Sequence, residues 1–128
     1  MKKIKRWLPV SLCKKLSKEK FKDVERVWRR DVVSWWYVEK REKTLGGKFV
    51  HPILYNRYPC PTFEELLAVV LNKPGISFSL SHDTLAGFVV TLDDSKRHLM
   101  CCGIGITPIE ALCRAYLEAE KKGRLHDK

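Results

Sequence analysis

The alternation Ile-Ser-Phe-Ser-Leu-Ser over residues 76–81 is the feature that most constrains the fold. Apolar residues at every second position place one face of a β-strand against a core and leave its other face polar. Residues 88–92 repeat the pattern, and residues 98–106 form a third run after a polar turn. Three successive strands with short turns predict an antiparallel β-meander.

Two segments with helical spacing flank this predicted meander. The first begins at Thr62 with a capping box closed by Glu65, and the second begins at Thr107 with a box closed by Glu110. Both carry apolar side chains at i, i+3 and i+4, so each has one stripe to bury. Packing both helices on one face of the meander predicts a two-layer α+β fold.

The first half of the chain is expected to add a helix and a hairpin to this core. Apolar residues recur at helical spacing in residues 17–30, which predicts a basic amphipathic helix. The β-branched and aromatic segment that follows turns at Gly46-Gly47 and predicts a β-hairpin. We therefore expect a single domain over residues 1–128, with a basic arm at 1–16, a helix and hairpin at 17–59 and a helix–meander–helix core at 60–128.

Positive charge is concentrated in the first half. The chain has a net charge of +10; residues 1–59 hold 17 Lys and Arg against 6 Asp and Glu, and residues 60–128 hold 8 against 9. Such asymmetry predicts an anionic partner for the first half, namely nucleic acid, an acidic protein surface or anionic lipid. The alternative is a solvated basic face that only aids solubility.

All four tryptophans precede residue 37 and are interleaved with Lys and Arg. Cations with planar rings suit nucleic-acid binding and protein interfaces equally well. Trp7 is the ring expected to be exposed, and at least two of Trp28, Trp35 and Trp36 are expected in the core. The predicted binding residues are Lys2, Lys3, Lys5, Arg6, Trp7, Lys14, Lys15, Lys22, Arg26, Arg29 and Arg30.

The five cysteines predict reduced thiols in a cytoplasm, because their number is odd and no Cys-x-x-Cys occurs. Consecutive Cys101 and Cys102 are expected on opposite faces of a strand, and Cys113 on the buried helical stripe. We therefore expect packing cysteines rather than zinc ligands, and no cofactor. Gly103 and Gly105 are expected to let the strand bend into its helix, since the acidic Glu110 would repel a phosphate there.

Sequence motifs for catalysis and for membranes are missing. The chain has no nucleophile elbow, Walker loop, His-Glu-x-x-His or calcium loop. We therefore expect that it is not an enzyme, with a small enzyme of unknown type as an alternative. No run approaches the roughly eighteen apolar residues of a membrane span. The apolar run 7–13 is short and broken by Pro9, so an export signal is not expected.

The predicted order of elements over residues 61–122 resembles the double-stranded-RNA-binding domain, as does the Gly-Ile-Gly before the last helix. That family carries a lysine cluster at the start of its last helix. This chain has Thr107-Pro108-Ile109-Glu110 there. The resemblance therefore implies a similar fold without the element that contacts phosphate.

Two motifs are similar to those of small bacteriophage and prophage proteins, including the phage α-β-α sandwich family. They are Tyr58-Pro59-Cys60-Pro61-Thr62 before the first helix and residues 107–115 at the start of the last. The resemblance covers residues 58–122 and implies a phage or mobile-element accessory protein in a bacterial cytoplasm. Some small phage proteins inhibit host defence complexes, including CRISPR systems.

These observations predict a non-enzymatic binding protein. Its basic, aromatic half would dock on an acidic host protein or a ribonucleoprotein and inhibit it. Direct binding of DNA or RNA by the same half is the alternative. An exposed edge strand would also allow a homodimer.

Overall fold

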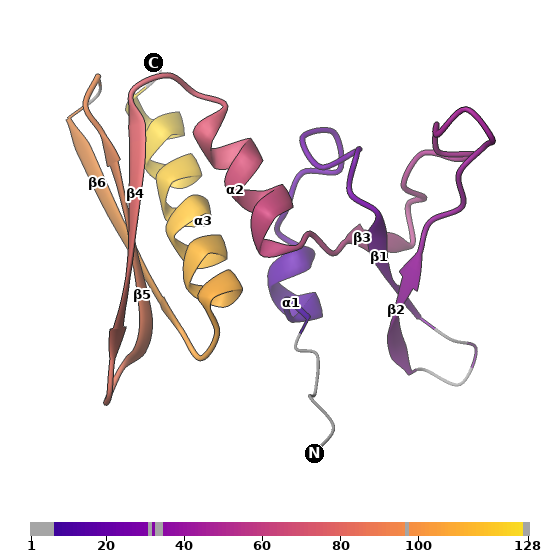
Figure 1. Cartoon of the computed structure of the whole chain (residues 1–128), viewed down its shortest axis with the longest axis horizontal. Coiled ribbons are helices and arrows are strands. Elements are labelled where there is room, and N and C mark those ends of the chain that lie inside the picture. Colours follow the sequence, from indigo (N-terminus) through magenta and orange to yellow (C-terminus); the bar gives the residue numbers. More distant parts are fainter. Residues whose placement is uncertain (1–6, 31, 33–34, 97, 127–128) are drawn as a thin grey trace. The chain divides into compact units, whose positions relative to one another are not determined.

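The computed structural model describes residues 7–30, 32, 35–96 and 98–126 (Figure 1). The chain divides into two compact units, residues 1–62 (unit 1) and 63–128 (unit 2). The boundary lies close to residue 60, where the sequence separates a basic half from a helix–meander–helix core. A single domain over the whole chain stays a prediction.

Unit 1 has a short helix and a small antiparallel sheet in its described part. The sheet has the order β2-β1-β3, with Trp28 opposite Val38 of β2 on one side and Tyr58 of β3 on the other. The elements are α1 (Val10–Cys13), β1 (Arg26–Arg30), β2 (Trp36–Lys40) and β3 (Arg57–Pro59). The chain between β2 and β3 turns at Gly46-Gly47, where Lys43 and Phe49 form one isolated bridge.

The predicted helix over residues 17–30 is wrong, because residues 26–30 form the central strand β1. Phe21 and Val24 are buried, as a helical stripe would require, but they reach the core from an irregular segment before the strand. Pairing with both β2 and β3 satisfies the backbone of β1, and the β-branched and aromatic residues there suit a sheet. Tertiary pairing has overridden the local helical spacing.

The structure also corrects where the hairpin of this half turns and shows that the predicted arm contains a helix. The β-hairpin is made by β1 and β2, so its connection lies at residues 31–35 and not at Gly46-Gly47. The predicted arm contains α1, which begins directly after Pro9. Leu8, Cys13 and Leu16 around this helix are buried, so this part of the arm belongs to the core of unit 1.

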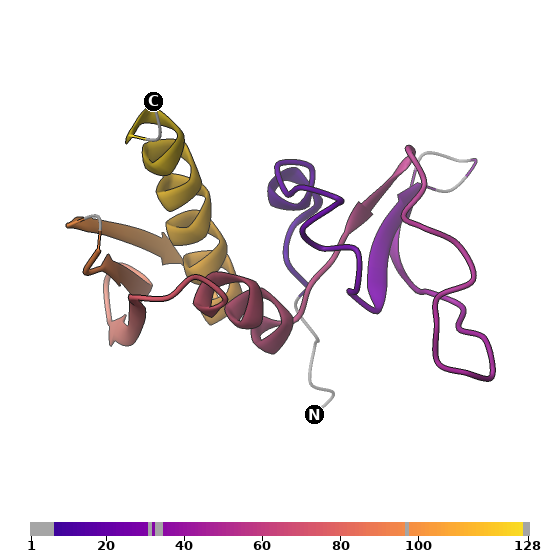
Figure 2. The same cartoon turned by 90° about the horizontal axis from the view of Figure 1, so that it is seen from above.

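Unit 2 is the predicted two-layer α+β fold. An antiparallel meander of order β4-β5-β6 is covered on one face by both helices, and Figures 1 and 2 show α2 and α3 on the same side of the sheet. The elements are α2 (Phe63–Leu71), β4 (Ile76–Asp83), β5 (Gly87–Asp94), β6 (Leu99–Gly105) and α3 (Pro108–His126).

The start of α3 has the predicted capping box. The Glu110 backbone N–H donates to Thr107 Oγ1 at 3.3 Å, and the Thr107 backbone N–H donates to Glu110 Oε2 at 3.3 Å. The carboxylate also accepts from the Ile106 backbone N–H at 3.1 Å. Glu110 is therefore committed to capping, as the sequence indicated.

The glycines before α3 serve helix packing. A Cβ at Gly105 would lie 2.7 Å from the Ala111 backbone nitrogen, and a Cβ at Gly103 would lie against the Ala111 backbone oxygen and the Ala115 backbone nitrogen. Ala111 and Ala115 are fully buried, so α3 lies directly on the backbone of β6. The Gly-x-Gly pattern therefore allows close packing of strand and helix.

Candidate binding site

Strand β1 sends its side chains to both faces of the unit 1 sheet, because neighbouring side chains of a strand point in opposite directions. Trp28 shares one face with Trp36 of β2 and Tyr58 of β3, as the pairing registers show. Arg29 lies on the other face, with Tyr37 and Arg57 as its paired residues.

The face that carries Trp28 is the one on which the chain around α1 packs. The Trp28 indole Nε1 donates to the Leu8 carbonyl oxygen at 2.7 Å. The rings of Trp36 and Tyr58 lie beside each other, with centroids 5.8 Å apart. Trp28, Trp36 and Tyr58 are all half-buried, so each ring has one part in the core and another at the surface.

Two lysines that follow α1 lie over these rings. Lys14 Nζ is 5.1 Å from the Trp36 ring centroid and 5.6 Å from that of Tyr58. Lys18 Nζ is 5.3 Å from the Tyr58 centroid. These distances are those of cation–π contacts. Lys18 Nζ also donates to the backbone carbonyls of Leu54 and Tyr55, at 2.9 and 2.8 Å.

Arg26 completes the group. It lies two residues before Trp28 in β1 and therefore on the same face of the sheet. Its guanidinium carbon lies 5.1 Å from the Trp7 ring centroid. Trp7, expected to be exposed, is half-buried in this contact, so that expectation is wrong. We call this group the aromatic–basic face; its residues are Trp7, Lys14, Lys18, Arg26, Trp36 and Tyr58.

The opposite face of the same sheet carries a cluster of mixed charge. Arg29 Nη1 lies 2.9 Å from Glu39 Oε1, and Arg57 Nε lies 3.6 Å from Glu39 Oε2. Arg29 also lies over the Tyr37 ring, 6.0 Å from its centroid. Because Glu39 is shared by two cations, this face is less basic than the aromatic–basic face.

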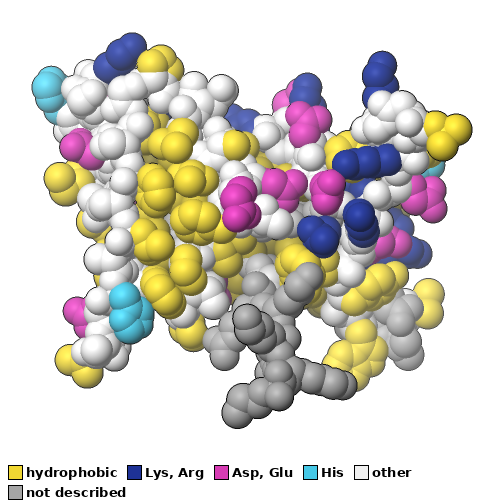
Figure 3. Space-filling model, viewed as in Figure 1, with side chains coloured by type: hydrophobic (Ala, Val, Ile, Leu, Met, Phe, Trp, Pro, Cys, Tyr) yellow, Lys and Arg dark blue, Asp and Glu magenta, His cyan; other side chains and the backbone are white. Residues whose placement is uncertain are grey.

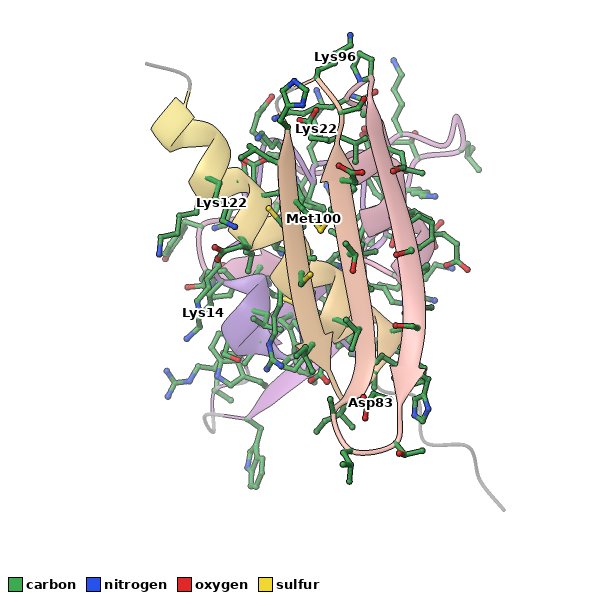
Figure 4. The ribbon with its side chains drawn as sticks, turned by 90° about the vertical axis from the view of Figure 1, so that its left-hand side faces the viewer. Lys14, Lys22, Asp83, Lys96, Met100 and Lys122 are labelled. Atoms are coloured by element: carbon green, nitrogen blue, oxygen red, sulfur yellow. The ribbon has the colours of Figure 1, made fainter. Side chains whose placement is uncertain are left out.

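The predicted binding residues therefore do not form one surface. Arg29 and Arg30 belong to opposite faces of β1. Lys22 is in the irregular segment, where its Nζ lies 3.9 Å from Glu19 Oε1, and Figure 4 shows it well apart from Lys14. Lys15 is exposed in the turn after α1. Lys2, Lys3, Lys5 and Arg6 lie outside the described residues.

Arg41, which the sequence reasoning did not select, has a structural role. Its guanidinium donates to the carbonyls of Lys22 and Val24 at 2.7 and 2.9 Å, and to that of His51 at 2.8 Å. It also lies 3.8 Å from the centroid of the Phe49 ring. Burial lowers the pKa of Arg41 from its ordinary value. Arg41 thus ties the segment before β1 to the loop after β2.

Exposed aromatic surface in unit 1 lies elsewhere than predicted. Trp35 is 74% exposed, whereas Trp28 and Trp36 are half-buried. Trp35 directly precedes β2, so it lies beside Trp36 in the sequence but outside the sheet. The sequence contained no signal that separates these two adjacent rings.

The cysteines follow the predicted placement. Cys101 and Cys113 are buried, and Cys102, on the outward face of β6, is exposed. Burial raises the pKa of the Cys101 thiol. Among the described residues, no three or more His, Cys, Asp or Glu side chains are placed to hold a metal ion.

Within the described ranges, no helix has the length and apolar character to cross a membrane. No family model matches the chain. No curated protein and no solved structure is significantly similar to it.

Proposed function

We propose that this chain is a non-enzymatic accessory protein of a phage or mobile element. Unit 1 would dock its aromatic–basic face on an anionic host partner, either an acidic protein or a ribonucleoprotein. Docking there would inhibit a host defence complex such as a CRISPR system. The observation that carries the proposal is the position of Lys14 and Lys18 over the Trp36 and Tyr58 rings.

The distribution of charge supports this choice of unit. Residues 1–62 hold 17 Lys and Arg against 6 Asp and Glu, a net of +11, while residues 63–128 have a net of −1 from 8 against 9. The whole positive excess therefore belongs to unit 1. In Figure 3, the Lys and Arg side chains of the visible face gather mostly over this unit. A field of this kind attracts an anionic partner and speeds its association.

The geometry of the rings favours a protein partner. A nucleic-acid base can stack only on an open ring face. Lysines lie over the rings of Trp36 and Tyr58, so a base would have to displace them. Cations beside half-buried rings suit instead a protein surface, where carboxylates contact the lysines and apolar groups contact the ring edges. An acidic protein surface is therefore the favoured target.

One observation favours the alternative, which is direct binding of DNA or RNA. Trp35 is 74% exposed and lies close in sequence to Arg30, which is itself exposed. An open ring beside a cation can stack a base while the cation contacts a phosphate. This alternative centres the nucleic acid on the exposed Trp35 ring rather than on the ring of Trp36, which lies opposite Arg30 in the sheet.

The test is a tagged capture from bacterial lysate, with and without nuclease, followed by mass spectrometry. Lys14→Glu should abolish capture of the partner, whereas Lys48→Glu, an identical charge change at an exposed loop position, should retain it. Loss of all partner proteins on nuclease treatment, together with binding of the purified chain to protein-free DNA or RNA, would establish the nucleic-acid alternative. Equal capture by the two variants would contradict the assignment of the aromatic–basic face.

Salt titration of the captured complex separates the two targets further. Phosphate contacts make the logarithm of affinity fall with the logarithm of salt by about one unit per contact. An interface centred on Trp36 and Tyr58 should lose less, because its apolar part is insensitive to salt. A steep slope together with full sensitivity to Trp35→Ala would place the site on the exposed ring instead.

A further inference from the structure

Strand β4 forms one edge of the unit 2 sheet, since β5 is its neighbour on one side and the sheet ends on the other. Figure 4 looks onto the outward face of this sheet, with β4 along one edge and Asp83 at the end of that strand. The strand is 8 residues long. An edge of this length presents a row of backbone donors and acceptors to a further strand.

Apart from Asp83 at its last position, this edge has none of the usual protection against pairing. Residues 76–82 include no Pro, Lys, Arg, Asp or Glu. Its register with β5 runs without a bulge from Ile76 opposite Asp94 to Asp83 opposite Gly87. Edge strands that stay single usually carry a charge, a proline or a bulge.

The helix side of β4 is also incompletely covered. Helix α3 packs on β5 and β6, and α2 reaches β4 only in part, where the Phe63 ring lies 6.3 Å from that of Phe78. Val90 and Leu92 of β5 are 0% and 4% exposed, whereas Leu80 of β4, directly opposite Val90, is 42% exposed. Hydrophobic side chains gather on the visible face of unit 2 in Figure 3. Of these three apolar side chains on the helix side of the sheet, Leu80 at the free edge is therefore the most exposed.

The sequence of β4 is nearly symmetric about Ser79. Pairing with an antiparallel copy around that residue sets Phe78 opposite Leu80, Ser77 opposite Ser81 and Ile76 opposite His82. Every apolar residue then continues the helix-side layer, and every serine continues the outward face. Such self-complementarity is what a two-fold interface between identical subunits requires.

We propose that β4 pairs antiparallel with β4 of a second copy, around a two-fold axis at Ser79. The two sheets join into one sheet of six strands, and Leu80 of each copy lies beside Phe78 of the other. The backbone groups of both edges become paired, and the exposed part of Leu80 is covered. This interface lies wholly in unit 2, so it is independent of the binding role of unit 1.

Sedimentation equilibrium of the full chain tests the proposal. The wild type should be a dimer, and Ser79→Lys should raise its dissociation constant about tenfold or more, because two like charges would meet at the axis. Thr91→Lys is the matched control: Thr91 lies opposite Ser79 on the central strand β5 and points to the same outward face. That variant should remain dimeric.

A mixing experiment guards against a variant that only misfolds. Ser79→Glu should be as monomeric as Ser79→Lys, and an equimolar mixture of the two should form heterodimers, since opposite charges then meet at the axis. Wild-type protein that is monomeric at about 100 µM would overturn the proposal. So would equal dimerisation of the Ser79→Lys and Thr91→Lys variants, which would place the interface elsewhere.

Discussion

Replacing Gly105 by Ala tests whether the Gly-Ile-Gly sequence exists to let α3 lie on β6. The new Cβ would lie 2.7 Å from the Ala111 backbone nitrogen and 3.0 Å from the Glu110 backbone carbon. Both are main-chain atoms of the first turns of α3, so no side-chain rotation can relieve the contact. The helix or the strand must move.

The size of the movement gives the expected cost. Ordinary contact begins at 3.4 Å, so the Ala111 nitrogen must retreat from 2.7 Å by 0.7 Å. A gap of 0.5–1 Å forfeits about a quarter to a half of the dispersion energy of the atoms facing it. Ala111, Leu112 and Ala115 are fully buried in this layer and would lose part of their packing. We expect a loss of about 2–3 kcal/mol, within the range of overpacked cores.

Urea denaturation of the full chain, followed by far-UV circular dichroism, measures this loss. The helical signal reports mainly on unit 2, where α2 and α3 lie. Gly46→Ala makes the same substitution in unit 1 without a clash, because its Cβ would meet Thr44 Oγ1 at 3.8 Å, an ordinary contact. That variant should unfold within about 0.5 kcal/mol of the wild type. A Gly105→Ala variant whose helical signal is lost at the same urea concentration as that of the wild type would refute the packing role.

The remaining predictions concern single contacts. Trp28→Phe should lower the free energy of unfolding by about 1 kcal/mol in urea titration, because the hydrogen bond from its indole to the Leu8 carbonyl is lost. Cys102 should react with iodoacetamide in the folded protein and Cys101 should not, as peptide mass mapping can show, because Cys101 is buried with a raised pKa. Backbone N–H groups of the following turn lower the pKa of Asp83, so an NMR titration should find that pKa below the ordinary value of an aspartate side chain. Its contribution to stability should be complete above its unfolded pKa and fall as the pH drops through the lowered value.

Unit 2 was predictable because its signals are local. The capping box at Thr107, the alternation in residues 76–81 and the stop at Pro74-Gly75 each depend on residues within one element or one turn. Gly75 has a φ of 88°, a conformation that glycine adopts without strain, at the point where α2 gives way to β4. Local and tertiary preferences agree there, and prediction succeeded.

Unit 1 was predicted less well because its central strand β1 also pairs with β3, about thirty residues further along the sequence. Trp28 lies opposite Tyr58, and nothing in the sequence around either residue predicts that the two are paired. Helical spacing at Phe21, Val24 and Val27 fitted a buried stripe, and all three are buried, but in an irregular segment and a strand. The period of the pattern was misread. These three residues are in the core as expected, but no tryptophan is fully buried: Trp28 and Trp36 are half-buried and Trp35 is exposed.

The wrong secondary structure for β1 also affected the selection of binding residues. The sequence predicted a helix here and counted Arg29 and Arg30 among the binding residues, whereas the strand β1 directs them to opposite faces. Lys18 was missed because its significance depends on Tyr58, which reaches it only through β3. Lys14 and Arg26 were selected only because the first half of the chain is rich in basic and aromatic residues. In the folded unit each of them does lie over an aromatic ring.

The anchoring of Lys18 has a thermodynamic consequence for any partner of unit 1. A free lysine side chain loses rotamer entropy worth up to about 2 kcal/mol when a ligand immobilises it. Lys18 Nζ is already held by the carbonyls of Leu54 and Tyr55 and lies over a ring, so most of that loss has occurred during folding. A carboxylate arriving at this site meets a preorganised charge, and more of the electrostatic attraction remains as affinity.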